Sequence, residues 1–271
     1  MKAPKKLKAK TIKQILKDAE NRYPREACGV IVIDKSDNKT EIYIPCENVA
    51  TDQTQEFAIC PEEFAKAEEI GTVVGIVHSH PDQTTRPSLM DIAVMTRHRE
   101  LELEIDPDSD PVPWHIVSWP EGDYRQVVPE VNKSLLGRPF VHNIWDCWAS
   151  CEAYYKKYHN IEFPAVERTD LWWEDKDAES MYEARYEDWG FYRVETPEPG
   201  DMIVMQIGRT YHPNHAGIYL GEVTEFEGEK LHGSPLMFHH LWGQESNVIV
   251  YGGQWSQRAR LILRHKGVKH E

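Results

Sequence analysis

Two histidines, one serine and one aspartate lie within the fourteen residues HSHPDQTTRPSLMD, positions 78–91. His78 and His80 end an apolar segment, TVVGIVHSH, that is typical of a strand. Because side chains alternate between the faces of a strand, both imidazoles point the same way. Asp91 follows one turn into an expected helix, where its carboxylate can turn back toward the strand end. Two neutral imidazoles and a carboxylate leave the fourth position of tetrahedral Zn²⁺ open to water, as in catalytic zinc sites.

The same segment also has an interpretation without a metal. Ser88 and Asp91 fit the pattern S-x-x-D, which is that of a helix capping box. Surface histidines beside a proline-flanked loop are common. The spacing alone therefore leaves both a capped turn and a metal site open.

A second group of reactive residues lies in the other half of the chain. Cys147 lies in the first turn of an expected helix, DCWASCEAYYKKYH, and a helix N-terminus lowers the pKa of a thiol. A nucleophilic cysteine needs an imidazole as base and a third polar group to orient that base. His215 in NHAGIYLG and His239 in LMFHH are the candidates. The composition alone favours the alternative, in which Cys147 and Cys151 are ordinary buried helix residues and the histidines are unrelated.

The elements that must position these residues form two groups. The pattern predicts an α/β or α+β unit over residues 1–128, with helices at 11–23, 61–71 and 88–100 and strands at 28–34, 41–45, 72–80, 114–119 and 122–128. Residues 129–138 are expected to be a linker, because proline and glycine punctuate this polar stretch. The second domain, residues 139–271, is expected to have helices first, at 146–159 and roughly 170–189, and then strands at 201–207, 215–221, 235–240, 247–252 and 260–265. Together these elements predict an α+β protein of two domains.

Composition narrows the classes of function. The 271 residues are 40% hydrophobic and 10% aromatic, which is typical of a globular protein. A formal net charge of −14 disfavours general binding to a phosphate backbone, so no nucleic-acid partner is expected. No apolar run approaches the ~18–20 residues of a membrane span, and no secretory signal is recognisable. Five cysteines without disulfide spacing suit synthesis in a reducing cytoplasm.

The first group of residues resembles a known family. HSHP followed after six residues by SLMD resembles the signature of the JAMM (MPN-positive) metallopeptidases, H-x-H-P and S-x-x-D. That family also has a glutamate before a small-residue strand, which PREACGVIV supplies as Glu26. The resemblance implies that His78, His80 and Asp91 bind Zn²⁺ and that Glu26 is the general acid/base. It also implies that Ser88 donates a hydrogen bond to the developing oxyanion.

The second group resembles the NlpC/P60 cysteine peptidases. The motifs DCW, PGDMIVM and HAGIYLG are similar to the D-C, P-G-D-[LM] and H-x-G-I-Y-[LIV]-G hallmarks of that family. The resemblance implies that Cys147 is the nucleophile, His215 the base and His239 the third residue. Two features depart from the family pattern: DCWAS replaces the common D-C-S-G, and the loop between His215 and His239 is longer than usual. The long loop leaves His240 and His232 as alternatives for the third role.

The order of the two halves is similar to that of the tail tip assembly protein K family of long-tailed bacteriophages, over nearly the whole chain. The resemblance implies a JAMM-type mixed β-sheet flanked by helices, followed by a papain-like NlpC/P60 α+β domain. It further implies synthesis in the host cytoplasm, a place at the virion tail tip, other tail tip proteins as partners, and cleavage of peptidoglycan stem peptides by the cysteine site. The substrate of the zinc site is left open between a tail protein and the cell wall.

Two other functions compete with a wall peptidase carrying two sites. A structural tail tip component could have one or both sites inactive in the particle. A JAMM isopeptidase could act on a protein substrate, although the NlpC/P60 half suits wall peptides better. The presence of every motif residue favours the two-site peptidase, because decayed sites usually lose such residues.

Overall fold

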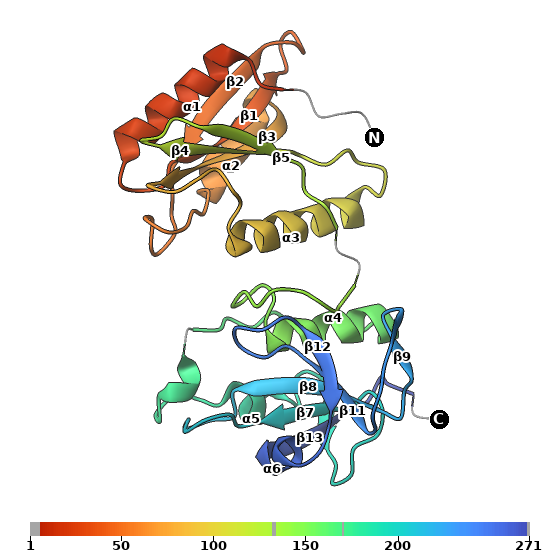
Figure 1. The fold of residues 1–271 in the computed structure, drawn as a ribbon. Coiled ribbons are helices and arrows are strands. Elements are labelled where there is room, and N and C mark those ends of the chain that lie inside the picture. Colours follow the sequence, from red (N-terminus) through yellow and green to blue (C-terminus); the bar gives the residue numbers. More distant parts are fainter. Residues whose placement is uncertain (1–5, 132–133, 170, 270–271) are drawn as a thin grey trace. The chain divides into compact units, whose positions relative to one another are not determined.

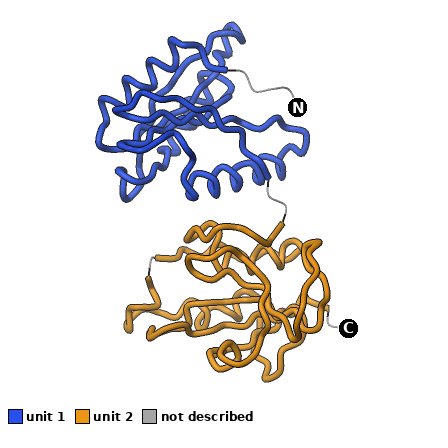
Figure 2. The backbone as a smooth tube through the Cα atoms, in the orientation of Figure 1, with its two compact units in different colours: residues 1–131 blue, residues 132–271 orange. Residues whose placement is uncertain are grey.

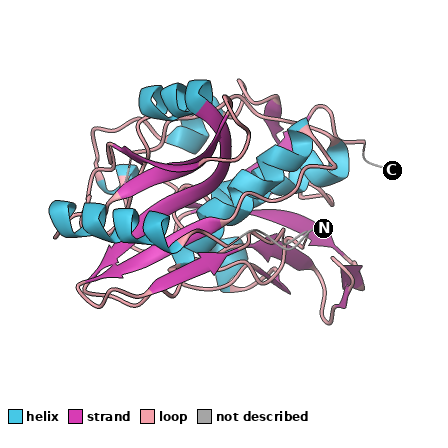
Figure 3. Ribbon diagram, turned by 90° about the horizontal axis from the view of Figure 1, so that it is seen from above, coloured by secondary structure: helices cyan, strands magenta, loops and turns pink. Residues whose placement is uncertain are grey.

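The computed structural model describes residues 6–131, 134–169 and 171–269. The chain divides into two compact units, residues 1–131 and 132–271 (Figure 2). The structure mixes helices and strands (Figure 3), and each unit contains both, so the predicted two-domain α+β class is confirmed. Among the described residues, no helix has the length and apolar character that crossing a membrane requires.

Unit 1 is built on a mixed five-stranded sheet with the order β2-β1-β3-β4-β5 (Figure 1). The strands β1 and β3 pair antiparallel, and β3 and β4 pair parallel. The elements are α1 (Ala9–Arg22), β1 (Cys28–Asp34), β2 (Glu41–Cys46), α2 (Pro61–Ile70), β3 (Gly71–Pro81), α3 (Leu89–Ile105), β4 (Trp114–Trp119) and β5 (Tyr124–Val127).

Apolar residues on both faces of the central strands account for the three-layer arrangement of unit 1. In β1, Ile31 packs against α1 together with Val77 of β3. The neighbouring residue Val30 points to the other face, where Ala67 of α2 and Met95 of α3 pack. Because successive side chains of a strand alternate between faces, an unbroken apolar strand needs cover on both sides. The sheet therefore lies between α1 and the helices α2 and α3.

Unit 2 is built on a six-stranded antiparallel sheet with the order β12-β11-β8-β7-β13-β6, plus a hairpin of β9 and β10. One face is covered by α4, whose Trp148, Cys151 and Tyr155 share a core with Ile218 and Phe238 of the sheet. The elements are α4 (Cys147–His159), η1 (Trp172–Glu174), α5 (Met181–Arg185), β6 (Phe191–Arg193), β7 (Met202–Met205), β8 (His215–Gly221), β9 (Glu225–Phe226), β10 (Glu229–Lys230), β11 (Leu236–His239), β12 (Asn247–Val250), α6 (Gln254–Arg258) and β13 (Ala259–His265).

The structure differs from the expected elements in several places. The strands β6, β9 and β10 and the helix α6 were not expected. The helical region expected over roughly residues 170–189 is wrong as a continuous element: residue 170 lies outside the described residues, and over residues 171–189 only η1 and the short α5 form. The aromatic side chains of this segment instead pack into the core of unit 2. Leu135 and Leu136, within the expected linker, are buried in that same core. Helix α3 extends to Ile105, five residues beyond the expected end.

Candidate active sites

Three potential metal ligands meet in unit 1. The Nε2 atoms of His78 and His80 lie 3.0 Å apart, and each lies 3.1 Å from a carboxylate oxygen of Asp91. All three residues are buried. The edges of a tetrahedron with zinc–ligand bonds of about 2.0–2.1 Å are about 3.3 Å long. The three atoms are therefore spaced closely enough to share one small cation.

The chemistry of these atoms also fits a cation. The Nδ1 of His80 lies 2.8 Å from the carbonyl oxygen of Thr84, which can only accept, so Nδ1 carries the proton. In the neutral ring, Nε2 of His80 is then a bare acceptor that faces an Asp91 oxygen and the other imidazole. Acceptors that face one another in a buried place need a positive charge between them.

Local structure fixes the ligands from both sides. The histidines end β3, and Asp91 lies in the first turn of α3. Ser88 is the N-cap of this helix and forms a full capping box: its hydroxyl accepts from the Asp91 N–H, and its own N–H donates to Asp91 Oδ2 at 2.7 Å. The Ser88 hydroxyl also donates to the same Oδ2 at 2.8 Å. The capping box is thus compatible with a metal site, and Ser88 orients the Asp91 carboxylate.

Glu26 is placed beside the ligands by strand pairing. Cys28 of β1 lies opposite His78 of β3, and the pairing continues where the Ser79 N–H donates to the Ala27 carbonyl at 2.9 Å. Continued by one residue, this register puts Glu26 opposite His80. A cavity of about 400 Å³ is lined by Glu26, His80, Ser88 and Asp91. The sequence prediction that these residues gather thus agrees with their placement in the structure.

The environment of Glu26 suits proton transfer. Burial raises the pKa of Glu26 to about 8, opposed by His80 and reinforced by the carboxylates of Asp91 and Glu56. A carboxyl group whose pKa lies near neutrality can both accept and return a proton at working pH.

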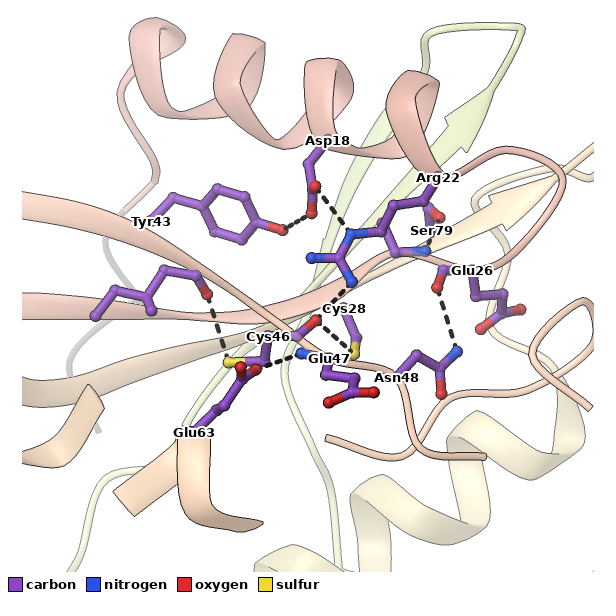
Figure 4. Close-up of polar contacts among 12 residues, drawn as sticks. Asp18, Arg22, Glu26, Cys28, Tyr43, Cys46, Glu47, Asn48, Glu63 and Ser79 are labelled. Carbon is purple, nitrogen blue, oxygen red and sulfur yellow. Dashed lines mark hydrogen bonds and ion pairs between the residues drawn. The ribbon is translucent and has the colours of Figure 1, made fainter. Parts of the chain in front are cut away.

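Several residues that support this site were missed at the sequence level. The hydroxyl of Ser79 accepts from the Ala27 N–H at 2.8 Å, and the amide of Asn48 donates to the Glu26 carbonyl at 3.2 Å (Figure 4). Phe57 stacks on the His78 ring with centroids 4.4 Å apart. For Ser79 the motif HSH was a usable signal, because a residue between two ligands faces the opposite side of the strand. Nothing in the sequence pointed to Asn48 or Phe57.

In unit 2, Cys147 is the first residue of α4. The preceding Asp146 caps the helix by accepting from the Ala149 N–H at 2.9 Å. Its other oxygen accepts from the Asn143 N–H at 2.9 Å and from Nη1 of Arg168 at 2.6 Å. Asp146 is 2% exposed and Arg168 10% exposed, so the ion pair is buried beside the thiol.

His215 begins β8 and shares a cavity of about 90 Å³ with Cys147. Its Nε2 lies 3.0 Å from Nδ1 of His239, at the end of β11. The two alternatives for the third residue are placed elsewhere: His240 contacts Ser150 and the Gln244 carbonyl, and His232 is exposed. His239 is therefore the histidine that the structure brings to His215.

Burial dominates the electrostatics of the cysteine site. It raises the pKa of the Cys147 thiol to about 11, and the Asp146 carboxylate adds to the effect. The pKa lowering expected from the helix N-terminus is outweighed. Burial also holds the pKa of His215 well below its ordinary value, reinforced by His239 and His240. These pKa shifts favour the neutral form of both the Cys147 thiol and the His215 imidazole, which line the same cavity. The sulfur lies 4.0 Å from the Asn214 carbonyl oxygen.

Aromatic side chains form much of the cleft around Cys147. Tyr182 places its hydroxyl 3.7 Å from Sγ. The other aromatic residues of the cavity are Phe140, Trp172, Trp173 and Trp242. Trp172, Trp173 and Tyr182 come from the segment that was expected to be a helix over roughly residues 170–189. The structure gives this segment a place in the wall of the cleft.

Comparison with known proteins places each half of the chain in a family. Residues 8–127 match the family of prokaryotic homologs of the JAB domain, and residues 137–264 match the NlpC/P60 family. Tail tip assembly protein K of Escherichia phage N15 is 38% identical over 97% of this chain and 97% of its own length. The chain belongs to the tail tip assembly protein K family.

A second relative extends the similarity. Tail tip assembly protein K of Escherichia phage lambda is 31% identical over 76% of this chain and 88% of its own length. A solution structure of a Desulfitobacterium hafniense protein matches 46% of this chain at 18% identity, with a TM-score of 0.33, which is too low to support an argument. The predicted family and the order of its two domains are confirmed.

Proposed function

We propose that this member of the tail tip assembly protein K family is a peptidase with two hydrolytic centres. The cysteine site of unit 2 would cleave stem peptides of peptidoglycan, and the zinc site of unit 1 would cleave a second amide bond. The observation that best supports enzymatic activity is the cavity that Cys147 and His215 share, with the imidazole of His239 3.0 Å from that of His215. A protein with only a structural role has no need of this arrangement.

The geometry supports a general-base mechanism at Cys147. Because Nε2 of His215 is occupied by His239, Nδ1 is the ring nitrogen left to take the thiol proton. Thiol and imidazole are both neutral at rest, so the proton moves as sulfur attacks the carbonyl carbon. His215 then returns the proton to the leaving amine, and water hydrolyses the thioester. The contact with His239 holds the base in one orientation.

In unit 1, His78, His80 and Asp91 would hold the metal. A zinc ion bound there would polarise the substrate carbonyl and lower the pKa of water to about 7. Glu26 would take a proton from the attacking water and pass it to the leaving amine. Ser88 orients Asp91 in the resting structure, and its hydroxyl would have to turn from that carboxylate to donate to an oxyanion.

The biological setting follows from the family. We infer that the chain is made in the host cytoplasm, is located at the virion tail tip and contacts other tail tip proteins. Opening the wall locally at the tip would let the tail reach the inner membrane. The partner of the cysteine site itself would be a stem peptide, because the proposed catalytic groups are buried and only a chain that enters the cavity would reach them.

Digestion of purified peptidoglycan by the zinc-loaded protein would test this function. We expect released muropeptides cut within the stem peptide, with loss of that cleavage in Cys147→Ala. The matched control is Cys151→Ala, one helical turn along α4, which should retain it. His80→Ala would assign any second cleavage to unit 1. The enzymatic proposal would be refuted if Cys147→Ala and His80→Ala both matched the wild type and elemental analysis found no zinc.

A further inference from the structure

The cavity of unit 1 that contains Glu26, His80 and Asp91 has a second, apolar lining. Its volume is about 400 Å³, within the range of about 300–1,000 Å³ typical of ligand pockets. Large apolar side chains that line it include Phe57, Ile59, Phe64, Ile76, Val94 and Trp114. They come from the segment between β2 and α2, from both α2 and α3, and from β3 and β4. The apolar lining is therefore built by several elements rather than by one exposed patch.

Aromatic contacts join this lining directly to the metal ligands. Phe57 stacks on the ring of His78 with an interplanar angle of 15°, and Trp114 lies edge-on to both rings, with centroids 5.6 Å from Phe57 and 5.8 Å from His78. A group seated against Phe57 thus lies beside the ligands. A substrate peptide can therefore place a side chain in the apolar part of the cavity while the carbonyl group of a neighbouring residue lies at the metal ligands.

We propose that the zinc site cleaves a peptide bond next to a large apolar side chain, such as Leu, Met or Phe, and that its substrate is a protein segment rather than a wall stem peptide. The inference rests on the zinc peptidase activity proposed above. In the reaction, water adds across the C–N bond: its oxygen joins the carbonyl carbon, and protons pass to the leaving amine.

The chemistry of the pocket discriminates between the two substrate classes. Stem peptides carry methyl groups and charged carboxylate or ammonium groups. A methyl group would leave most of 400 Å³ unfilled. The apolar side chains of Phe57, Ile59 and Phe64 offer a charged group no partner, unlike the polar part of the lining, so seating a charge among them is costly. A large apolar side chain would fill the space and would be transferred out of water. Burying it favours such a substrate about tenfold to a hundredfold over one with alanine at the same position.

The test uses the zinc-loaded, full-length Cys147→Ala protein, so that only the zinc site can cut. A defined pool of peptides with varied sequences and a set of muropeptides are digested, and the products are identified by mass spectrometry with and without chelator. We expect chelator-sensitive cuts with Leu, Ile, Met or Phe at one fixed position beside the scissile bond. Val94→Phe, which narrows the pocket, should lower kcat/KM for these peptides at least tenfold.

Ile92→Phe is the matched control, because Ile92 lies on the same helix but is exposed and does not line the cavity. Ile59→Phe narrows the pocket from another segment and replaces Val94→Phe if that variant does not fold. The double variant Cys147→Ala/Glu26→Gln should bind a fluorescently labelled preferred peptide without cutting it. Adding Val94→Phe to this variant should weaken the binding.

Three results would overturn the inference and leave the zinc peptidase activity standing. These are chelator-sensitive cuts without apolar preference, cuts confined to muropeptides, and an equal loss of kcat/KM in Val94→Phe and Ile92→Phe. Absence of chelator-sensitive cleavage of any substrate would instead overturn the zinc activity, and this inference with it. The two failures are thus distinguishable.

Discussion

Acidification from pH 7 to pH 5 should destabilise unit 2 through its buried histidines. His239 is 2% exposed, and burial lowers its pKa to about 4, with the charge of His240 acting in the same direction. In the unfolded chain the pKa returns to its ordinary value of about 6.5. Below that pH the unfolded state binds the proton and the folded state does not, so stability falls as the pH falls.

The size of the effect follows from the two pKa values. At pH 5 the unfolded imidazole is almost fully protonated, 1.5 pH units below its pKa, while the folded one is still mostly neutral. At 1.36 kcal/mol per unit this gives a loss of about 2 kcal/mol from His239 alone. Burial also lowers the pKa values of His215 and His240, so both add to the loss in the same window.

Urea unfolding of the full-length protein, followed by tryptophan fluorescence, measures this loss. Seven of the nine tryptophans lie in unit 2, so the signal reports mainly on that unit. His239→Asn cannot titrate and should show a difference in unfolding free energy between pH 7 and pH 5 that is about 2 kcal/mol smaller than that of the wild type. His232→Asn, at an exposed position, is the control and should not change it. An unchanged difference in His239→Asn would refute the assignment of a buried neutral imidazole.

Three further outcomes are expected. Ser88→Ala removes the N-cap of α3 and should cost about 0.5–2 kcal/mol in urea unfolding, whereas Ser88→Thr should restore most of it. Asp146→Asn retains an N-cap but removes a charge that raises the Cys147 pKa, so alkylation by iodoacetamide at pH 8, followed by mass spectrometry of that cysteine, should be faster than in the wild type. Chelation should lower the thermal unfolding midpoint of the zinc-loaded protein, and the midpoint of His80→Ala should not respond to chelator.

Much of the site could be predicted because its signals are local in the sequence. The alternation of a strand places His78 and His80 on one face, and the S-x-x-D pattern predicts the capping box that holds Asp91. The strands Cys28–Asp34, Trp114–Trp119 and His215–Gly221 lie at the expected positions, because each is an apolar run with clear ends. Such segments specify their own conformation.

The features that could not be predicted depend on contacts between distant segments. The pairing of Arg168 with Asp146 joins an irregular stretch to the N-cap of α4, and no spacing rule connects the two. Tyr182, Tyr186 and Trp189 recur at i, i+4 and i+7 among acidic residues, which is a helical pattern. Trp172 and Tyr182 nevertheless pack separately into the core of unit 2. Tertiary burial thus overrides local propensity there.

The two sites place a functional residue in the first turn of a helix, but the N-cap has a different effect in each. In α3 the capping box directs the Asp91 carboxylate toward two imidazoles, so the cap orients a ligand. In α4 the cap is itself a carboxylate beside the Cys147 thiol, and its charge opposes the thiolate that the helix end favours. The pairing with Arg168 offsets part of that charge. A helix N-terminus in this protein therefore fixes geometry, while burial and neighbouring charges determine the protonation state of the residues at each candidate site.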